Sequence, residues 1–251
     1  MYFTTLDCAS AYWSIPLEEE DKEKTAFSGP RGKFEFNVTP YGLCNAGASY
    51  QRMMDLSLSG LSIYKILAYL DDIVVFSRTL EEHHRQLEEL LGRLRKCNIS
   101  LNLSKCAFAM QEVDYLGYTL SAAGIKPQKR LTDAIRNYPT PTNKKELKRF
   151  LGISNYYRDF IPMYSNVGAP LTALTSDKSV FTWSDECKSA FDTLKNLLCS
   201  YPVLAFPKLG ESFVVEVDAS DVAVGGVLLQ EDERGIEHPV AYFSNTETRA
   251  T

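Results

Sequence analysis

Two adjacent carboxylates, Asp71 and Asp72, stand between two short apolar runs in the stretch 66–76. Runs of this length suit strands better than helices, and a two-residue connection predicts a hairpin with the Asp pair as its turn. The alternative is an ordinary solvated turn, because Asp is common in turns for reasons unrelated to chemistry. Two like charges beside apolar strands raise each other's pKa unless a cation neutralises them. Mg²⁺, which takes oxygen ligands, would supply that charge.

A third carboxylate, Asp7, ends another apolar, strand-like run at 3–6. Carboxylates at the ends of neighbouring strands can meet at one edge of a sheet. Three such groups are what a two-metal phosphoryl-transfer site requires. The sequence therefore predicts that Asp7, Asp71 and Asp72 converge, although they are far apart along the chain.

The composition sets the class of protein. The chain has 251 residues, a formal net charge of −5, six Cys and three His. It contains no apolar run of the ~18–20 residues that a membrane helix needs, and its N-terminus lacks the features of a signal peptide. The six Cys form no Cys-x-x-Cys pair, so neither a zinc module nor a disulfide framework is predicted. We expect an intracellular globular protein with one to three domains and no membrane partner.

The distribution of charge says more than its total. Residues 122–163 carry nine Lys or Arg and three acidic residues, whereas residues 206–251 carry three basic and nine acidic residues. A local basic face can bind a phosphate backbone whatever the net charge is. The alternative is a solvated basic face with no partner.

The remaining elements follow from periodicity and punctuation. We expect a second hairpin over 27–38, a helix that begins near 45–48, and a helix over 80–96. Thr79 and Glu82 form a capping box for the last of these. Adjacent His83 and His84 point in different directions on a helix, so a metal site there is not expected. Pro139 and Pro141 predict a break. Beyond it we expect basic and amphipathic helices, one of them over 185–199, and two strands within 213–229.

At this point several short segments, taken together and in order, resemble a known family. The chain is similar to the reverse transcriptase region of the Pol polyprotein of gypsy-type LTR retrotransposons, and the resemblance covers nearly its whole length. The segments that carry it are Leu6-Asp7, Tyr12-Trp13, Lys24-Thr25-Ala26-Phe27, Tyr41-Gly42-Leu43-Cys44-Asn45-Ala46, Gln51-Arg52-Met53-Met54-Asp55, Tyr69-Leu70-Asp71-Asp72, Tyr115-Leu116-Gly117-Tyr118, Phe150-Leu151-Gly152, Tyr156-Tyr157-Arg158-Asp159-Phe160-Ile161 and Asp218-Ala219-Ser220.

The resemblance implies an α+β fold. Residues 1–124 would form a reverse transcriptase palm, an antiparallel sheet with packed helices, together with part of the fingers. Residues 125–205 would form a helical thumb and connection, and residues 206–251 the N-terminal part of a truncated RNase H-like α/β domain. Most of the fingers that precede the palm in this family, and the later RNase H segments, have no counterpart here. We therefore expect a fragment with weak activity or none.

The resemblance also implies roles for individual residues. Asp7, Asp71 and Asp72 would be catalytic and would hold two Mg²⁺ ions, with Mn²⁺ as an alternative, and the backbone carbonyl of Cys8 would be a further ligand. Lys105 would be the general acid for the departing pyrophosphate, although an exposed structural lysine is the alternative. The other implied roles are nucleotide binding by Tyr12 and Gln51, a primer grip formed by Tyr115, Leu116, Gly117 and Tyr118, contact with the template-primer backbone through Lys144, Lys145, Lys148 and Arg149, and metal binding by Asp218 in an incomplete RNase H site.

The implied reaction is RNA-directed DNA polymerisation, in which deoxynucleotides are added to a primer on an RNA or DNA template. The implied partners are template with primer, dNTPs, and the rest of the Pol polyprotein, including the missing fingers, the remaining RNase H endonuclease and an integrase. A cytoplasmic virus-like particle with access to the nucleus would be the location. The alternative function is a catalytically inactive remnant that only binds nucleic acid through the basic region.

Overall fold

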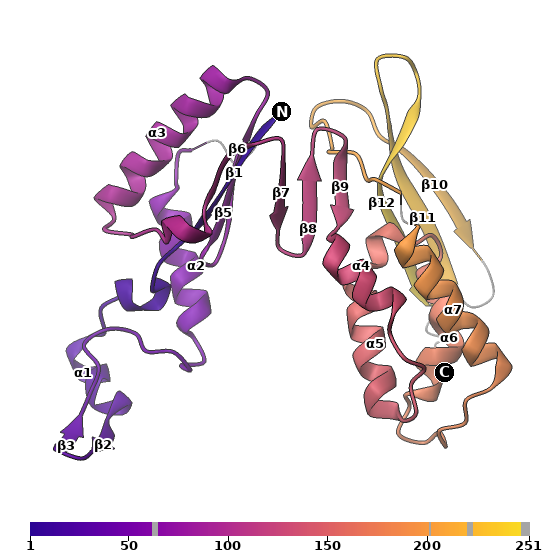
Figure 1. Ribbon diagram of the computed structural model, residues 1–251, viewed down its shortest axis with the longest axis horizontal. Helices are drawn as coiled ribbons and strands as arrows, with labels where there is room; N and C mark the ends of the chain where they lie inside the picture. Colours follow the sequence, from indigo (N-terminus) through magenta and orange to yellow (C-terminus); the bar gives the residue numbers. More distant parts are fainter. Residues whose placement is uncertain (62–64, 201, 220–222, 247–251) are drawn as a thin grey trace. The chain divides into compact units, whose positions relative to one another are not determined.

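The computed structural model describes residues 1–61, 65–200, 202–219 and 223–246. The chain divides into two compact units, an N-terminal unit, Met1–Leu116, and a C-terminal unit, Gly117–Thr251 (Figure 1). Among the described residues, no helix has both the length and the apolar character needed to cross a membrane.

A four-stranded antiparallel sheet forms the centre of the N-terminal unit, with the strand order β4-β5-β1-β6. β-branched and aromatic residues, which favour strands, dominate the two central strands. Their Phe3, Leu6, Ile73 and Val75 side chains are buried. The strands are β1 (Tyr2–Asp7), β4 (Ile66–Tyr69), β5 (Asp72–Ser77) and β6 (Ala107–Met110), and β7 (Glu112–Tyr115) follows them.

Two helices share one core with this sheet, α2 (Ala46–Ser57) and α3 (Leu80–Lys96). Both are amphipathic, and their apolar faces supply the buried side chains of Tyr50, Met54, Leu90 and Leu94, among others. The predicted cap is confirmed, because the Thr79 side chain accepts a hydrogen bond from the Glu82 N–H group. The helix α3 therefore begins and ends where the sequence predicts it, and α2 begins at Ala46, within the predicted range of 45–48.

The segment 8–45 is less regular. The predicted hairpin over 27–38 is shorter than expected, since β2 (Phe27–Gly29) pairs with β3 (Gly32–Phe34) and the pairing stops there. Val38 instead forms an isolated bridge with Pro16. Other short elements are the 3-10 helices Ala11–Ser14, Glu23–Thr25 and Leu103–Lys105, and α1 (Glu19–Lys22).

Helices dominate the C-terminal unit after the hairpin of β8 (Tyr118–Ser121) and β9 (Gly124–Pro127). Asn143 and Ser184 cap two of the helices by accepting hydrogen bonds from Glu146 N–H and Cys187 N–H. Their shared core includes Leu147, Phe150, Phe191 and Leu194. The helices are α4 (Lys129–Arg136), α5 (Lys144–Tyr156), α6 (Tyr164–Leu174) and α7 (Asp185–Cys199), with a 3-10 turn at Arg158–Phe160.

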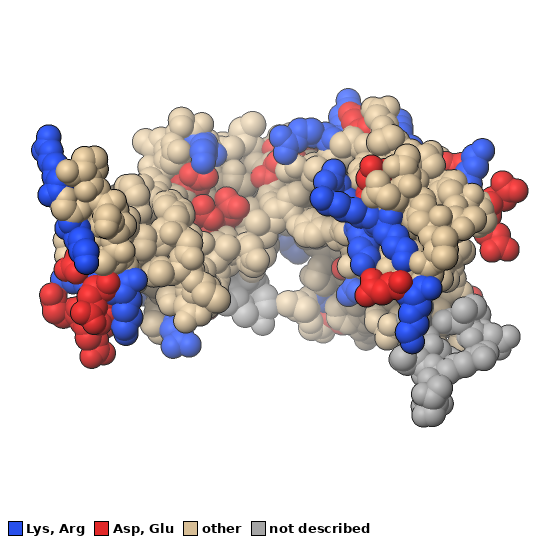
Figure 2. Space-filling model, turned by 90° about the horizontal axis from the view of Figure 1, so that it is seen from below, with Lys and Arg blue, Asp and Glu red and all other residues tan. Residues whose placement is uncertain are grey.

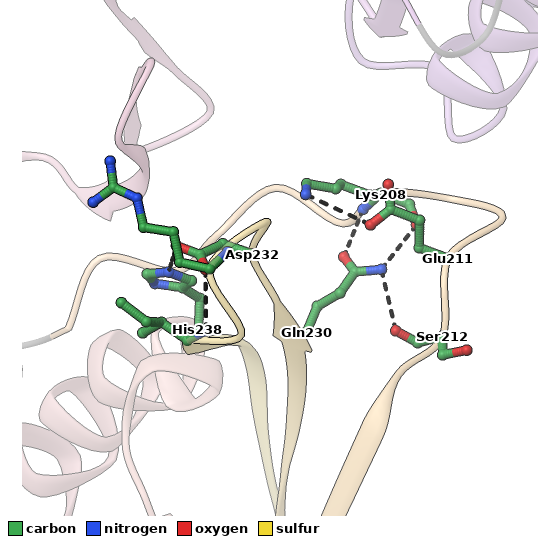
Figure 3. Close-up of polar contacts among 8 residues, drawn as sticks. Lys208, Glu211, Ser212, Gln230, Asp232 and His238 are labelled. Atoms are coloured by element: carbon green, nitrogen blue, oxygen red, sulfur yellow. Dashed lines mark hydrogen bonds and ion pairs between the residues drawn. The ribbon is translucent and has the colours of Figure 1, made fainter.

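The chain ends in a three-stranded antiparallel sheet, β10 (Val214–Ala219), β11 (Ala223–Glu231) and β12 (Glu237–Thr246), with β11 in the middle. The sheet lies close to α6, because a Cβ atom on Gly225 would stand 2.1 Å from the Met163 sulfur. The buried Gln230 amide accepts from Lys208 N–H and donates to the Lys208 carbonyl, which fixes the approach to β10 (Figure 3). Asp232 pairs with His238 across the β11–β12 turn at 3.2 Å (Figure 3).

A buried histidine ties α3 to the sheet. His83 is fully buried, with Nε2 2.7 Å from Thr4 Oγ1 and Nδ1 2.8 Å from Ser77 Oγ. The Ser77 hydroxyl donates to the Thr79 carbonyl and the Ala109 N–H donates to Thr4 Oγ1. Counting donors then assigns the proton of a neutral ring to Nδ1, with Nε2 accepting from Thr4. A charged ring would leave the Thr4 hydroxyl without this acceptor.

Acid should therefore weaken the N-terminal unit. Burial lowers the pKa of His83, and the positive charge of His84 lowers it further, so the folded state resists protonation that the unfolded chain accepts below about pH 6.5. Stability is retained above that pH and should fall by at most about 1.4 kcal/mol per pH unit below it. Urea denaturation between pH 7.5 and 5.5 measures this slope. His83→Asn should reduce this slope, and the exposed control His84→Asn should reduce it much less, because burial is the larger cause of the lowered pKa. Equal slopes in all three proteins would refute the assignment.

Candidate active site

The strand pairing brings Asp7 to the carboxylate turn. In the antiparallel β1–β5 ladder Asp7 lies directly opposite Asp72, and Leu6 lies opposite Ile73. The Cys8 N–H group donates to the Asp71 carbonyl at 2.9 Å. The register is fixed because a slip of one residue would turn the buried face of both strands outward. Residues about 65 positions apart thus meet at one end of the sheet.

The turn lies one residue earlier than the sequence predicts. Tyr69 pairs with Asp72, so Leu70 and Asp71 are the two turn residues and Asp72 is already the first residue of β5. Asp71 is exposed, whereas Asp72 is partly buried. The prediction that both carboxylates occupy the turn is therefore wrong for Asp72. Strand pairing continues as far as Asp72 because β1 offers a partner on its other side.

Negative charge that is only partly compensated characterises this end of the sheet. The pKa of Asp72 is raised by its burial, and further by the neighbouring carboxylates of Asp71 and Asp7. Lys105 acts in the opposite direction, and its Nζ lies 3.3 Å from Asp7 Oδ2. The Asp7 side chain is only 20% exposed, whereas that of Lys105 is 63% exposed. Because the Lys105 side chain is mostly exposed, its ammonium can leave Asp7 when another cation binds there.

A small cavity of about 170 Å³ opens between these groups. Asp7, Asp72 and Lys105 line it, together with Tyr115 and Asp114. Asp114 is an exposed residue of β7 that is not among the predicted site residues. In the sequence it stands one residue before the predicted primer grip, and this position alone does not distinguish it from an ordinary surface carboxylate.

The donor atoms suit a divalent cation, but the described side chains are not arranged around a common metal position. Across residues 1–61, 65–200, 202–219 and 223–246, no three His, Cys, Asp or Glu side chains form a group that could hold a metal ion. The carboxylates of Asp7 and Asp72 nevertheless fit such an ion in charge and in the type of donor atom. The Lys105 ammonium already provides a cation beside Asp7. The metal ligands, the Cys8 carbonyl included, stay predictions.

The two residues predicted to bind nucleotide both belong to the N-terminal unit. Tyr12 is half-buried and meets Tyr41 and Tyr50 edge-on, with ring centroids 5.3 and 5.8 Å away. The Gln51 side chain contacts the backbone of β4 and its turn, accepting from Leu70 N–H at 2.7 Å. Their roles toward a nucleotide stay predictions.

The predicted primer grip spans the division between the two units, so each half is described separately. In the N-terminal unit, Tyr115 and Leu116 line the cavity, and the Tyr115 hydroxyl donates to the Asp72 carbonyl at 3.4 Å. In the C-terminal unit, Gly117 has a φ of 81° and its carbonyl accepts from the Tyr157 hydroxyl. Tyr118 stacks on the Tyr156 ring, with centroids 5.5 Å apart.

The basic residues of α5 divide into two kinds. Lys144 donates to the carbonyls of Ser176 and Ser179 at 2.6 and 2.5 Å, so its ammonium closes the loop that follows α6. Lys148 has a long ion pair to the exposed Asp177 at 3.9 Å. Figure 2 shows Lys and Arg gathered on the helices of the C-terminal unit, with acidic side chains among them.

Lys145 and Arg149 are exposed on α5. The binding of a nucleic acid backbone by these side chains stays a prediction, and Lys144 is the least available of the four. On β10, Asp218 is exposed and lies opposite Gly225. Ser220, the last residue of the Asp-Ala-Ser segment, lies outside the described residues.

Comparison with known proteins decides the family. Residues 1–120 match the family described as reverse transcriptase (RNA-dependent DNA polymerase), and residues 183–251 match the RNase H-like domain found in reverse transcriptase. Residues 1–120 belong to the reverse transcriptase family. The chain is 42% identical over 256 residues to the Pol polyprotein from transposon opus of Drosophila melanogaster, an alignment that covers 98% of the chain and 25% of that protein.

Other relatives are also transposon polyproteins. The chain is 39% identical to that of transposon 297 of Drosophila melanogaster, with 98% of the chain and 23% of the relative covered. It is 36% identical to the transposon Tf2-3 polyprotein of Schizosaccharomyces pombe, with 99% and 19% covered. The chain thus spans a quarter or less of the length of these relatives.

Solved structures agree on the fold. A foamy viral protease-reverse transcriptase in complex with double-stranded DNA aligns with a TM-score of 0.87 at 26% identity, covering 99% of this chain and 43% of that one. The same kind of protein in complex with an RNA/DNA hybrid aligns with a TM-score of 0.85 at 26% identity, covering 99% and 33%. The predicted combination of a palm, helices and an RNase H-like sheet is confirmed as the fold class. The RNase H-like match begins at residue 183, inside the predicted thumb, and the predicted domain boundaries stay untested.

Proposed function

We propose that this chain adds deoxynucleotides to a primer on an RNA or DNA template, as the polymerase part of a retrotransposon Pol polyprotein. The observation that carries the proposal is the position of Asp7 opposite Asp72, with Asp71 hydrogen-bonded to Cys8 at the same end of the sheet. Strand pairing places two carboxylates together and the turn beside them carries the third, which is the set of groups that a positioned phosphoryl transfer requires. The complexes with double-stranded DNA and RNA/DNA hybrid formed by similar proteins support a template-primer as the partner.

The residues divide the work. Asp7, Asp71 and Asp72 would hold two Mg²⁺ ions, and the Cys8 carbonyl would be an additional ligand. These ions would lower the pKa of the primer 3′-hydroxyl and neutralise the leaving group. Tyr12 places its ring against the nucleotide sugar and excludes a 2′-hydroxyl, which selects deoxynucleotides. Lys105 donates a proton to the departing pyrophosphate.

The remaining segments bind the nucleic acid. Residues 115–118 hold the primer end, and the exposed cations of α5 follow the phosphate backbone of the template-primer. Asp218 would be the first metal ligand of an RNase H site. In this proposal residues 1–124 are the palm with part of the fingers, residues 125–205 the thumb, and residues 206–251 the start of the RNase H domain.

Removing one turn carboxylate should abolish the reaction. Asp71→Asn keeps the shape of the side chain and removes its charge, so Mg²⁺-dependent extension of a primer on a homopolymer template should fall by about 10³-fold or more, the size typical of losing an electrostatic contact made in the transition state. Asp133 of α4 is partly exposed and lies outside the site, so Asp133→Asn is the matched control and should extend as the wild type does. Near-normal incorporation by Asp71→Asn would exclude the assignment. Nucleic acid binding by the wild type without any extension would favour the non-catalytic remnant.

Lys105 should compete with the metal. Because its ammonium lies on Asp7, Lys105→Met should tighten Mn²⁺ binding about two- to fivefold, as expected from the worth of an exposed ion pair. The same change should slow extension, since the proton donor is lost. Lys105→Arg restores the ion pair and should bind Mn²⁺ as the wild type does. Electron paramagnetic resonance of free Mn²⁺ measures the affinity, and weaker binding by Lys105→Met would contradict the competition.

A further inference from the structure

The side chain of Gln51 forms hydrogen bonds with β4 and with the turn that follows it. Gln51 lies on α2 and is half-buried. Its Oε1 accepts from Leu70 N–H at 2.7 Å, and its Nε2 donates to the Ala68 carbonyl at 3.3 Å and to Asp55 Oδ1 at 2.9 Å. Both amide hydrogens are therefore used within the N-terminal unit.

The turn that Gln51 contacts has an unfavourable backbone. Leu70 has a φ of 51°, and it is followed by Asp71 before pairing resumes between Tyr69 and Asp72. A positive φ at the first turn residue suits Gly, and a Leu side chain makes that conformation costly. Such a residue keeps its conformation only when the surroundings hold it. The Leu70 N–H would otherwise have no partner in the β4–β5 ladder.

Two contacts hold the turn from two different elements. On one side, Gln51 of α2 accepts from Leu70 N–H. On the other, Cys8, directly after β1, donates its N–H to the Asp71 carbonyl at 2.9 Å. The peptide units on both sides of Leu70 and Asp71 are thereby fixed to the helix and to the strand that carries Asp7. The direction of the Asp71 side chain depends on both.

We propose that Gln51 is a positioning residue that holds the Leu70-Asp71 turn, and so sets Asp71 and Asp72 against Asp7 for metal binding. The inference rests on the proposed polymerase function, and it differs from a nucleotide contact in what it predicts. A side chain that touches the nucleotide alters the KM for dNTP. A side chain that places the carboxylates alters metal affinity and kcat.

The test compares Gln51→Leu and Gln51→Glu with the wild type. Leu can neither accept from Leu70 N–H nor donate to the Ala68 carbonyl, whereas Glu keeps the acceptor and loses the donor. Gln51→Leu should weaken Mn²⁺ binding about tenfold and lower kcat about 10- to 100-fold, the range expected when a group is misplaced by about 1 Å. The KM for dNTP should stay within about twofold, and Gln51→Glu should recover part of the loss. The exposed α2 position Ser49→Leu introduces the same side chain and is the matched control.

Circular dichroism at the assay temperature confirms that each variant is folded, so a general loss of structure is separated from a shifted turn. A raised KM with unchanged kcat and Mn²⁺ affinity would overturn the proposal in favour of a nucleotide contact. Unchanged values of all three would also overturn it.

The proposed function can fail separately. If the wild-type chain neither binds Mn²⁺ nor extends a primer, hydrogen exchange of the Leu70 amide still tests the positioning. That amide should be protected in the wild type and should exchange at least tenfold faster in Gln51→Leu, with the Cys8 amide less affected. Equal protection of Leu70 in both proteins would overturn the proposal.

Discussion

The structure of the site depends on two like charges being held opposite each other on neighbouring strands. Asp7 and Asp72 are cross-strand partners, an arrangement that by itself destabilises a sheet. It persists because the strands behind the carboxylates are buried, with Leu6 and Ile73 at 2% and 0% exposure. The hydrophobic contacts of these strands fix the register, and the register forces the carboxylates together. Lys105 offsets part of the resulting charge.

The turn that carries Asp71 is also fixed by contacts with other elements of the N-terminal unit. The turn has a strained Leu70, one contact from Gln51 and another from Cys8. Each contact comes from a different element of the same core, so folding of the N-terminal unit builds the site as a consequence of packing. The hydrogen bonds of the buried His83 fix α3 in the same way, because they join this helix to β1 through Thr4 and to β5 through Ser77.

Local signals predicted much of the fold. The capping box at Thr79, the helix over 80–96 and the helix over 185–199 follow from side-chain periodicity and cap chemistry, and all three are present. Pairing between segments that are distant in the sequence could not be predicted from these local patterns. The hairpin over 27–38 is cut short because Val38 pairs with Pro16 instead, and Asp72 joins β5 because β1 extends the ladder beside it.

The same division applies to the site. The residue types and their order pointed to Asp7, Asp71 and Asp72. Three features could be found only in the folded chain: the Lys105–Asp7 contact, the Lys144 contacts with the loop after α6, and the position of Asp114 in the cavity.

The most direct test of the convergence of Asp7, Asp71 and Asp72 on a metal site is anomalous scattering from crystals grown with Mn²⁺. We expect a peak between the carboxylates of Asp7 and Asp72, within reach of Asp71, with Lys105 displaced from Asp7. Well-ordered carboxylates without a peak, and with Lys105 still on Asp7 at saturating Mn²⁺, would contradict it.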